Sequence, residues 1–183
     1  MARKILTLVG GISKNSLNQK LFQAIRQLPM NDFELTPFDI SRLPFFSQDI
    51  ENDPPESVRK MKDEITSSAG VLLITPEYNR SMPGVLKNAL DWGSRPYGTS
   101  AWAKKPVGVM GASPGATGTF GAQHHLRQVL SGLNMFAMSS PEMYLKIDGS
   151  KAFDDKGRFA DEKLQELIRK YFSSFNEWVN RFG

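Results

Sequence analysis

Short apolar runs alternate with helix-like patterns along the chain. A run without polar positions is typical of a strand buried on both faces, whereas apolar residues three or four positions apart indicate one face of a helix. The periodic segments predict helices at Leu17–Leu28, Val58–Ile65, Val85–Leu90, His124–Leu133 and Leu164–Phe182. The runs predict five strands, with an extension of the fifth to Leu145 left open: Ile5–Val9, Phe33–Ile40, Val71–Ile74, Pro106–Met110 and Asn134–Ser139.

This alternation of strands and helices predicts a parallel sheet with right-handed crossovers. Five such units indicate an α/β fold, a three-layer doubly wound sandwich of the flavodoxin type with a five-stranded parallel sheet in the order 2-1-3-4-5. The chain of 183 residues has no internal repeat and no low-complexity linker, so we expect a single domain over residues 1–183.

Composition narrows the range of functions. Hydrophobic residues make up 40% of the chain and charged residues 23%, as in an ordinary globular domain. The lack of cysteine excludes disulfides, thiolate metal sites and cysteine nucleophiles. The net charge of +4 comes from dispersed basic residues, which disfavours nucleic acid and suits an anionic small ligand. No apolar segment approaches the ~18 residues of a membrane span, and no signal peptide is recognised, so we expect a cytoplasmic protein.

Three unusual loops follow the first, third and fourth predicted strands, at the sheet edge where doubly wound folds bind ligands. The first, Gly10–Asn18, sets small polar residues before a helix N-terminus, which suits a phosphate. The second, Thr75–Gly84, carries polar and aromatic residues between prolines, which suits a flat ring. The third, Gly111–Gly121, has glycines that let backbone approach a ligand. Each loop also has a simpler interpretation: the first as an ordinary helix start, the second as a surface loop and the third as a flexible connection.

The second loop and the helix after it carry a longer motif. It reads Pro76-Glu77-Tyr78-Asn79, then Ser81-x-Pro83-Gly84-x-Leu86-Lys87-Asn88-Ala89-x-Asp91-Trp92. This motif closely resembles the signature of the NADPH-dependent FMN reductase family, whose relatives include bacterial quinone, chromate and azo-dye reductases. The similarity extends from the first loop through His125–Leu130. The resemblance implies a flavodoxin-like fold, FMN as cofactor, and NADPH or NADH as co-substrate.

The resemblance also implies where FMN binds. The family's first loop usually reads Gly-Ser-x-Arg-x-x-Ser-x-Asn; here Gly11 and Ser13 replace the first serine and the arginine. Because a charge-assisted hydrogen bond contributes roughly 1.5–3 kcal/mol, we expect weaker FMN binding than in relatives unless Lys14 compensates. The implied cofactor-binding residues are Gly11, Ser13, Lys14, Asn15, Ser16, Leu17 and Asn18 at the phosphate, Pro76, Glu77, Tyr78, Asn79 and Arg80 around the ring, and Ser113 and Gly115 at its other edge.

The chemistry implied by the resemblance belongs to the flavin. NAD(P)H stacks on the exposed ring face and gives a hydride to flavin N5, and the reduced FMN then passes electrons to a small-molecule acceptor in the vacated position. We therefore assign no catalytic acid or base. Backbone N–H groups near Asn79 and Arg80 would favour the reduced, anionic ring, and the Arg80 side chain would either pair with the NADPH phosphate or face solvent. A quinone, azo compound, metal oxyanion or flavin would suit as acceptor.

Other functions fit the same pattern less well. A non-catalytic flavodoxin-like electron carrier usually has a Thr/Ser-rich phosphate loop and an acidic surface, which this chain lacks. A receiver domain needs an acidic pair after the first strand, where Gly10-Gly11 stands. The departures at Gly11 and Ser13 keep a flavin-free regulatory family member as an alternative.

Two further groups of residues need an interpretation. His124 and His125 point to different sides of a helix and cannot easily share a metal ion, so we predict no metal site. The resemblance implies a homodimer or homotetramer with His124 and Glu142 near the subunit boundary. Three aromatic residues of a Gly/Ser-rich stretch are expected at the surface, as a pocket wall or a partner contact: Trp92, Tyr97 and Trp102.

Overall fold

The structure, a computed structural model, describes residues 2–149 and 151–182, so Met1, Ser150 and Gly183 lie outside the described residues. The strands in these ranges are β1 (Arg3–Val9), β2 (Phe33–Phe38), β3 (Gly70–Ile74), β4 (Pro106–Ser113), β5 (Phe136–Ala137) and β6 (Tyr144–Lys146). The α-helices are α1 (Leu17–Arg26), α2 (Glu56–Ser67), α3 (Gly84–Gly93), α4 (Phe120–Gly132) and α5 (Glu162–Asn180), with short 3₁₀ turns at Ile40–Arg42 and Gln48–Ile50.

The strands form a parallel sheet in the order β2-β1-β3-β4-β5, which confirms the predicted order. The predicted fifth strand is wrong in one respect, because it is two short strands that pair with different parts of β4. β5 pairs with Pro106 and Val107, and β6 pairs with Gly111–Ser113. Pro141 lies between β5 and β6 and has no N–H to donate, so one continuous ladder cannot form through it. The sheet is therefore six-stranded rather than five-stranded.

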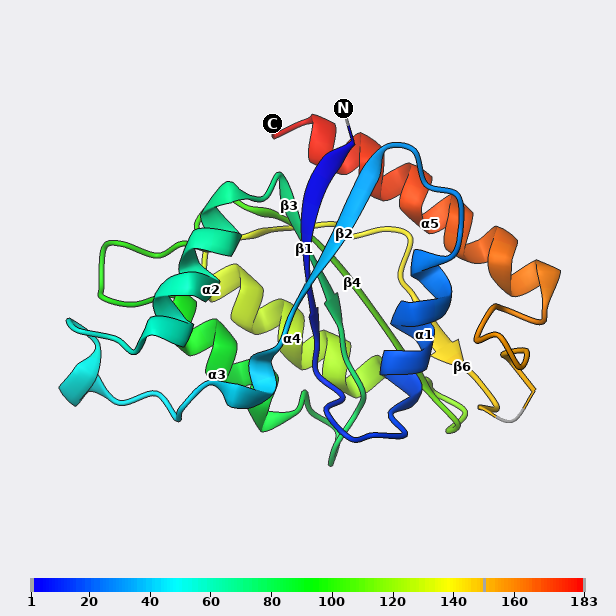
Figure 1. Ribbon diagram of the computed structural model, residues 1–183, viewed down its shortest axis with the longest axis horizontal. Helices are drawn as coiled ribbons and strands as arrows, with labels where there is room; N and C mark the ends of the chain where they lie inside the picture. The colour runs from blue at the N-terminus through cyan, green and yellow to red at the C-terminus, as the bar shows by residue number, and fades with distance from the viewer. Residues whose placement is uncertain (1, 150, 183) are drawn as a thin grey trace.

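Helices cover both faces of the sheet and give the predicted three layers. α1 and α5 lie on one face, and α2, α3 and α4 on the other (Figure 1). The run Ile5–Val9 is apolar at nearly every position because its side chains alternate between the two cores. Ile5 and Val9 pack with α1 and α5, whereas Leu6 and Leu8 pack with the opposite helices.

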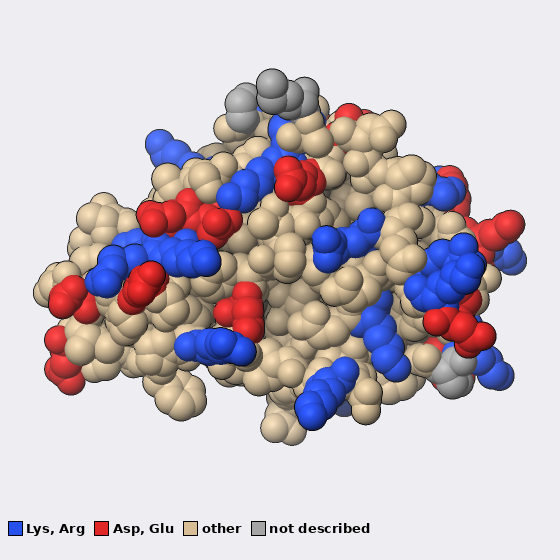
Figure 2. All heavy atoms as spheres, in the orientation of Figure 1, with Lys and Arg blue, Asp and Glu red and all other residues tan. Residues whose placement is uncertain are grey.

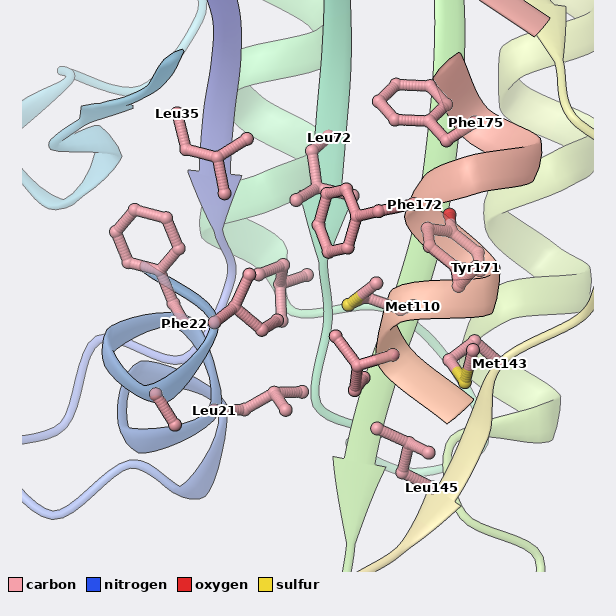
Figure 3. Packing of buried hydrophobic residues seen from close by; sticks show 14 of the residues in the cluster. Leu21, Phe22, Leu35, Leu72, Met110, Met143, Leu145, Tyr171, Phe172 and Phe175 are labelled. Atoms are coloured by element: carbon pink, nitrogen blue, oxygen red, sulfur yellow. The ribbon is translucent and has the colours of Figure 1, made fainter. Parts of the chain in front are cut away.

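The core under α1 and α5 is rich in aromatic side chains. The amphipathic pattern of the last helix correctly predicts most of this buried face, but Leu167 and Phe182 of that pattern are 45% and 40% exposed. Full burial of one such side chain contributes roughly 1.5–3 kcal/mol. Figure 3 shows α1, the sheet and α5 meeting through Leu21, Phe22, Leu72, Met110, Tyr171, Phe172 and Phe175.

The surface position expected for Trp92 and Trp102 is wrong. Trp92 is 1% exposed and Trp102 is fully buried. Each indole N–H donates to a backbone carbonyl, that of Trp92 to Pro44 and that of Trp102 to Leu90. These bonds satisfy the polar end of each ring and allow the rest to join the core. Of the three aromatics, Tyr97 alone is at the surface.

The loops after β1, β3 and β4 gather at one edge of the sheet, the lower edge in Figure 1. The third loop is shorter than the sequence predicts, since β4 continues to Ser113 and α4 already begins at Phe120. Basic and acidic side chains are interspersed on the face shown in Figure 2. Among the described residues, no helix combines the length and apolar character needed to cross a membrane.

Tyr171 makes a buried hydrogen bond that should appear in the pH dependence of stability. Its Oη donates to the Val109 carbonyl at 3.1 Å, and full burial raises the pKa of the phenol. The stability contributed by a raised pKa is complete below the unfolded-state value of 10.0 and is lost as the pH rises toward the folded-state value. Tyr171→Phe should therefore lower the unfolding free energy by about 1 kcal/mol at neutral pH.

The difference between wild type and Tyr171→Phe should shrink above about pH 10, because the variant has no phenol to ionise. Urea unfolding of both proteins at neutral pH and at about pH 10.5 measures this. A constant difference across that range would contradict the role given to the buried phenol.

Candidate functional site

A cavity of about 460 Å³ opens between the second and third loops at the carboxyl edge of the sheet. Five predicted site residues line it, from both loops: Glu77, Asn79, Arg80, Ser113 and Gly115. Ala116, Thr117 and Gly118 also line it and were not among the predicted residues, although the glycine-rich composition of their loop marks that segment. Gly118 has φ +60°, and a Cβ there would lie 2.8 Å from the backbone of Tyr144. Only glycine lets this loop lie so close to β6.

The second loop forms a tight turn at the cavity. Tyr78 and Ser81 exchange backbone hydrogen bonds at 2.9 and 3.0 Å, and the two residues between them are left-handed, with φ 52° at Asn79 and 65° at Arg80. Two consecutive left-handed residues characterise a two-residue hairpin turn. Within the described chain, the N–H groups of Asn79 and Arg80 donate no hydrogen bond. They are therefore available to acceptor atoms of a ligand in the cavity.

Glu77 ties this turn to the helix that follows the third loop. Its Oε2 accepts the N–H of Ala122 in the first turn of α4 at 3.0 Å. Its Oε1 lies 3.7 Å from Nη1 of Arg80, whose side chain is 81% exposed, against 12% for Glu77. The second and third loops thus have a fixed relative position. Tyr78 begins this turn and is half exposed, and Pro76 lies two residues before it; neither lines the cavity.

The first loop presents backbone donors at the N-terminus of α1. Ser16 caps the helix, since its Oγ accepts the N–H of Gln19 at 3.3 Å. Within the described chain, the N–H groups of Lys14, Asn15 and Leu17 donate no hydrogen bond. Unpaired N–H groups at a helix N-terminus make an anion site. The first loop does not line the cavity of the other two loops.

Gly11 and Asn18, two residues of the expected phosphate site, each have a structural role. A Cβ at Gly11 would lie 2.1 Å from the Oγ of Ser16, so the Ser16 hydroxyl occupies the space of the missing side chain. Asn18 is 2% exposed and bonds to both backbone groups of Ala112, donating to the carbonyl and accepting from the N–H at 2.9 Å each. The Asn18 amide therefore joins α1 to the end of β4, with its nitrogen and its oxygen each hydrogen-bonded to the backbone of Ala112.

The arrangement fits a ligand that combines a phosphate with a flat ring. Donors of the first loop suit the phosphate, and the cavity with the donors of Asn79 and Arg80 suits the polar edge of the ring. These features match FMN, the cofactor that the sequence resemblance implies. Ser13 and Lys14, both exposed, extend from the first loop beside the unpaired N–H groups.

The two histidines on α4 have separate partners. His125 Nδ1 lies 2.7 Å from Ser81 Oγ, and His124 Nε2 lies 3.2 Å from the hydroxyl of Tyr144. Desolvation, with the Glu142 carboxylate as a smaller cause, raises the pKa of Tyr144 to about 12. Among the described residues, no group of three or more His, Asp or Glu side chains could hold a metal ion.

Comparison with known proteins places this geometry in a family. The family model described as NADPH-dependent FMN reductase matches residues 3–149. A 2-hydroxy-1,4-benzoquinone reductase of a Burkholderia species is 45% identical over 179 residues, which cover 98% of this chain and 97% of that protein. A quinone reductase of Pseudomonas putida is 44% identical over 176 residues, covering 96% and 94%.

A solved structure has nearly the same fold over its whole length. It is FerB, a flavoenzyme NAD(P)H:(acceptor) oxidoreductase from Paracoccus denitrificans, with a TM-score of 0.94, 38% identity and complete coverage of both chains. An azoreductase from Bacillus anthracis has a TM-score of 0.57 at 18% identity and supports the fold alone. The flavodoxin-like fold predicted from the sequence is therefore confirmed.

Removing the Asn18 amide should loosen the contact between the first and third loops. Asn18→Ala leaves the buried N–H and C=O of Ala112 without partners, and an unsatisfied buried group costs about 1–3 kcal/mol. We expect the unfolding free energy to fall by about 2 kcal/mol or more. Asn15→Ala is the matched control, since Asn15 is exposed in the same loop. Urea unfolding compares the two variants, and equal stabilities would refute the structural role of Asn18.

Proposed function

The chain belongs to the NADPH-dependent FMN reductase family, and we propose that it reduces a small quinone by ping-pong exchange of a hydride through bound FMN. It is an oxidoreductase of the FMN and quinone reductase type, with FMN as cofactor and NADPH or NADH as co-substrate. One observation carries the proposal: donors suited to a phosphate and a cavity suited to a flat ring lie at one edge of the sheet.

The chain's own residues would bind and orient the cofactor. The unpaired N–H groups of the first loop and the Lys14 ammonium would hold the phosphate. The second and third loops would hold the ring, with the N–H groups of Asn79 and Arg80 donating to its polar edge. FMN, when bound, supplies an acceptor for hydride at N5 and a source of two electrons for a second molecule.

The shape of the site supports a ping-pong order of events. The cavity between the second and third loops would offer one exposed ring face to two substrates in turn, so the oxidised nucleotide would leave before the acceptor binds. Two relatives are named for quinones, one of them for 2-hydroxy-1,4-benzoquinone, and these names support a quinone as acceptor here. An azo compound, a metal oxyanion or a flavin is the alternative acceptor. We also propose a cytoplasmic location, where reduced nicotinamide nucleotides are available.

The proposal includes a homodimer or homotetramer. An exposed ring cluster beside the third loop supports it: Phe120 is 49% exposed and lies 4.1 Å, centroid to centroid, from His124 and 5.3 Å from Tyr144. Tyr144 also donates to Glu142 at 2.6 Å. Such a cluster offers apolar and hydrogen-bonding contacts to a second copy of the chain.

The first experiment is a visible absorbance spectrum of protein that has been soaked with FMN and desalted. We expect a retained flavin spectrum that bleaches when NADPH or NADH is added without oxygen and returns when a quinone follows. Steady-state rates should give parallel double-reciprocal lines, as ping-pong kinetics require. A colourless protein that consumes no NADPH would overturn the proposal in favour of a flavin-free family member. Bleaching without turnover of any acceptor would favour a non-catalytic electron carrier.

The Arg80 guanidinium is exposed and can bind a phosphate of the nucleotide. Its side chain is 81% exposed, and its Nη1 lies 3.7 Å from Oε1 of Glu77. We propose that Arg80 pairs with the 2′-phosphate of NADPH, which NADH lacks, so Arg80→Ala should raise the NADPH KM about tenfold, the value of one charge-assisted bond. The NADH KM serves as the control and should change less. An unchanged NADPH KM would leave Arg80 as a solvent-facing residue.

A further inference from the structure

Glu77 lies between two positive groups at the edge of the proposed flavin site. One is the first turn of α4, whose Ala122 N–H donates to Oε2 at 3.0 Å. The other is the Arg80 guanidinium, 3.7 Å from Oε1. Glu77 and Arg80 both line the cavity. A carboxylate with 12% exposure acts on such a cavity with little screening by water.

The helix end beside the cavity depends on Glu77 for its cap. Thr119, the N-cap residue of α4, makes no side-chain cap hydrogen bond. The Glu77 carboxylate supplies an acceptor from a different element, where it offsets the partial positive charge of the helix N-terminus. Gly121 provides the room, since a Cβ there would lie 3.0 Å from the Arg80 carbonyl oxygen and 3.2 Å from Glu77 Oε2. The sequence places glycine where the turn and the helix meet.

We propose that the negative charge of Glu77 lowers the reduction potential of bound FMN. Without this charge, the α4 N-terminus and Arg80 would make the potential higher. The inference rests on the proposed function. A hydride carries two electrons and one proton, so its addition gives the ring one net negative charge. Positive groups near the ring stabilise that charge, and the Glu77 carboxylate offsets them. The lower potential makes the reduced cofactor a stronger electron donor to the acceptor.

The test is the two-electron midpoint potential of bound FMN, measured by anaerobic equilibrium titration against a reference dye. Glu77→Gln keeps an amide oxygen for the Ala122 N–H and removes the charge. We expect the midpoint potential of Glu77→Gln to be about 30 mV higher than that of the wild type, because about 30 mV corresponds to a tenfold change in the ratio of reduced to oxidised FMN for a two-electron couple. Glu166→Gln is the matched control, the same change at an acid on α5 that pairs with Lys170, and it should keep the wild-type potential.

Arg80→Gln provides an independent second variant, because an 81% exposed side chain can be replaced without disturbing the fold. It removes a positive charge from the same site, so the potential should fall. Opposite shifts in the two variants would support charge control, since a merely structural disturbance has no reason to reverse sign. A potential that is the same in Glu77→Gln and Glu166→Gln, or shifts of one sign in both cavity variants, would overturn the inference. Wild-type protein that retains no FMN would instead overturn the proposed function, and this inference with it.

Discussion

The strands that lead to the candidate site are buried on both faces, and this burial decides where polar chemistry can lie. Every residue of β3 is buried, as are Ile5–Val9 of β1 and 106–112 of β4. A polar side chain inside this sheet would lose its water without gaining a partner, at a cost of about 1–3 kcal/mol. Ligand-binding groups therefore lie where the strands end. Because the strands are parallel, the loops after β1, β3 and β4 end at the same edge and form one site.

This constraint explains why the sequence predicts the architecture well and some details poorly. Apolar runs and helical periodicity are local signals, and they are sufficient for the strand order. The split of the fifth strand depends on Pro141 and on how far β4 extends, which no local pattern shows. The burial of Trp92 and Trp102 also depends on distant partners. Their stretch is polar, but each indole N–H donates to a backbone carbonyl elsewhere, that of Pro44 and that of Leu90.

In the candidate site too, the sequence predicts where the loops lie but not every contact that their side chains make. The family motif correctly locates the second loop, and the sheet topology brings it beside the third. The partners of Asn18 and Glu77 are backbone groups of Ala112 and Ala122, far away in the sequence. A backbone partner leaves no trace in residue type, so sequence reasoning assigns both side chains to the ligand. The structure shows that each side chain also fixes one loop against another, which preorganises the donors that a ligand would meet.

Gly11 and Ser13, which replace a serine and an arginine of the family's first loop, differ in their structural consequences. At Gly11 the volume of a side chain is filled by the Ser16 hydroxyl, 2.1 Å from where a Cβ would stand. A side chain at residue 11 would displace the Ser16 hydroxyl from its present position, where it caps the helix by accepting the N–H of Gln19. At residue 13 a serine stands in place of the arginine, and the exposed Lys14 is the next residue in the sequence. The departure at residue 11 leaves one hydroxyl, that of Ser16, where the family pattern has two, and the departure at residue 13 removes a guanidinium, so we expect both to weaken phosphate binding.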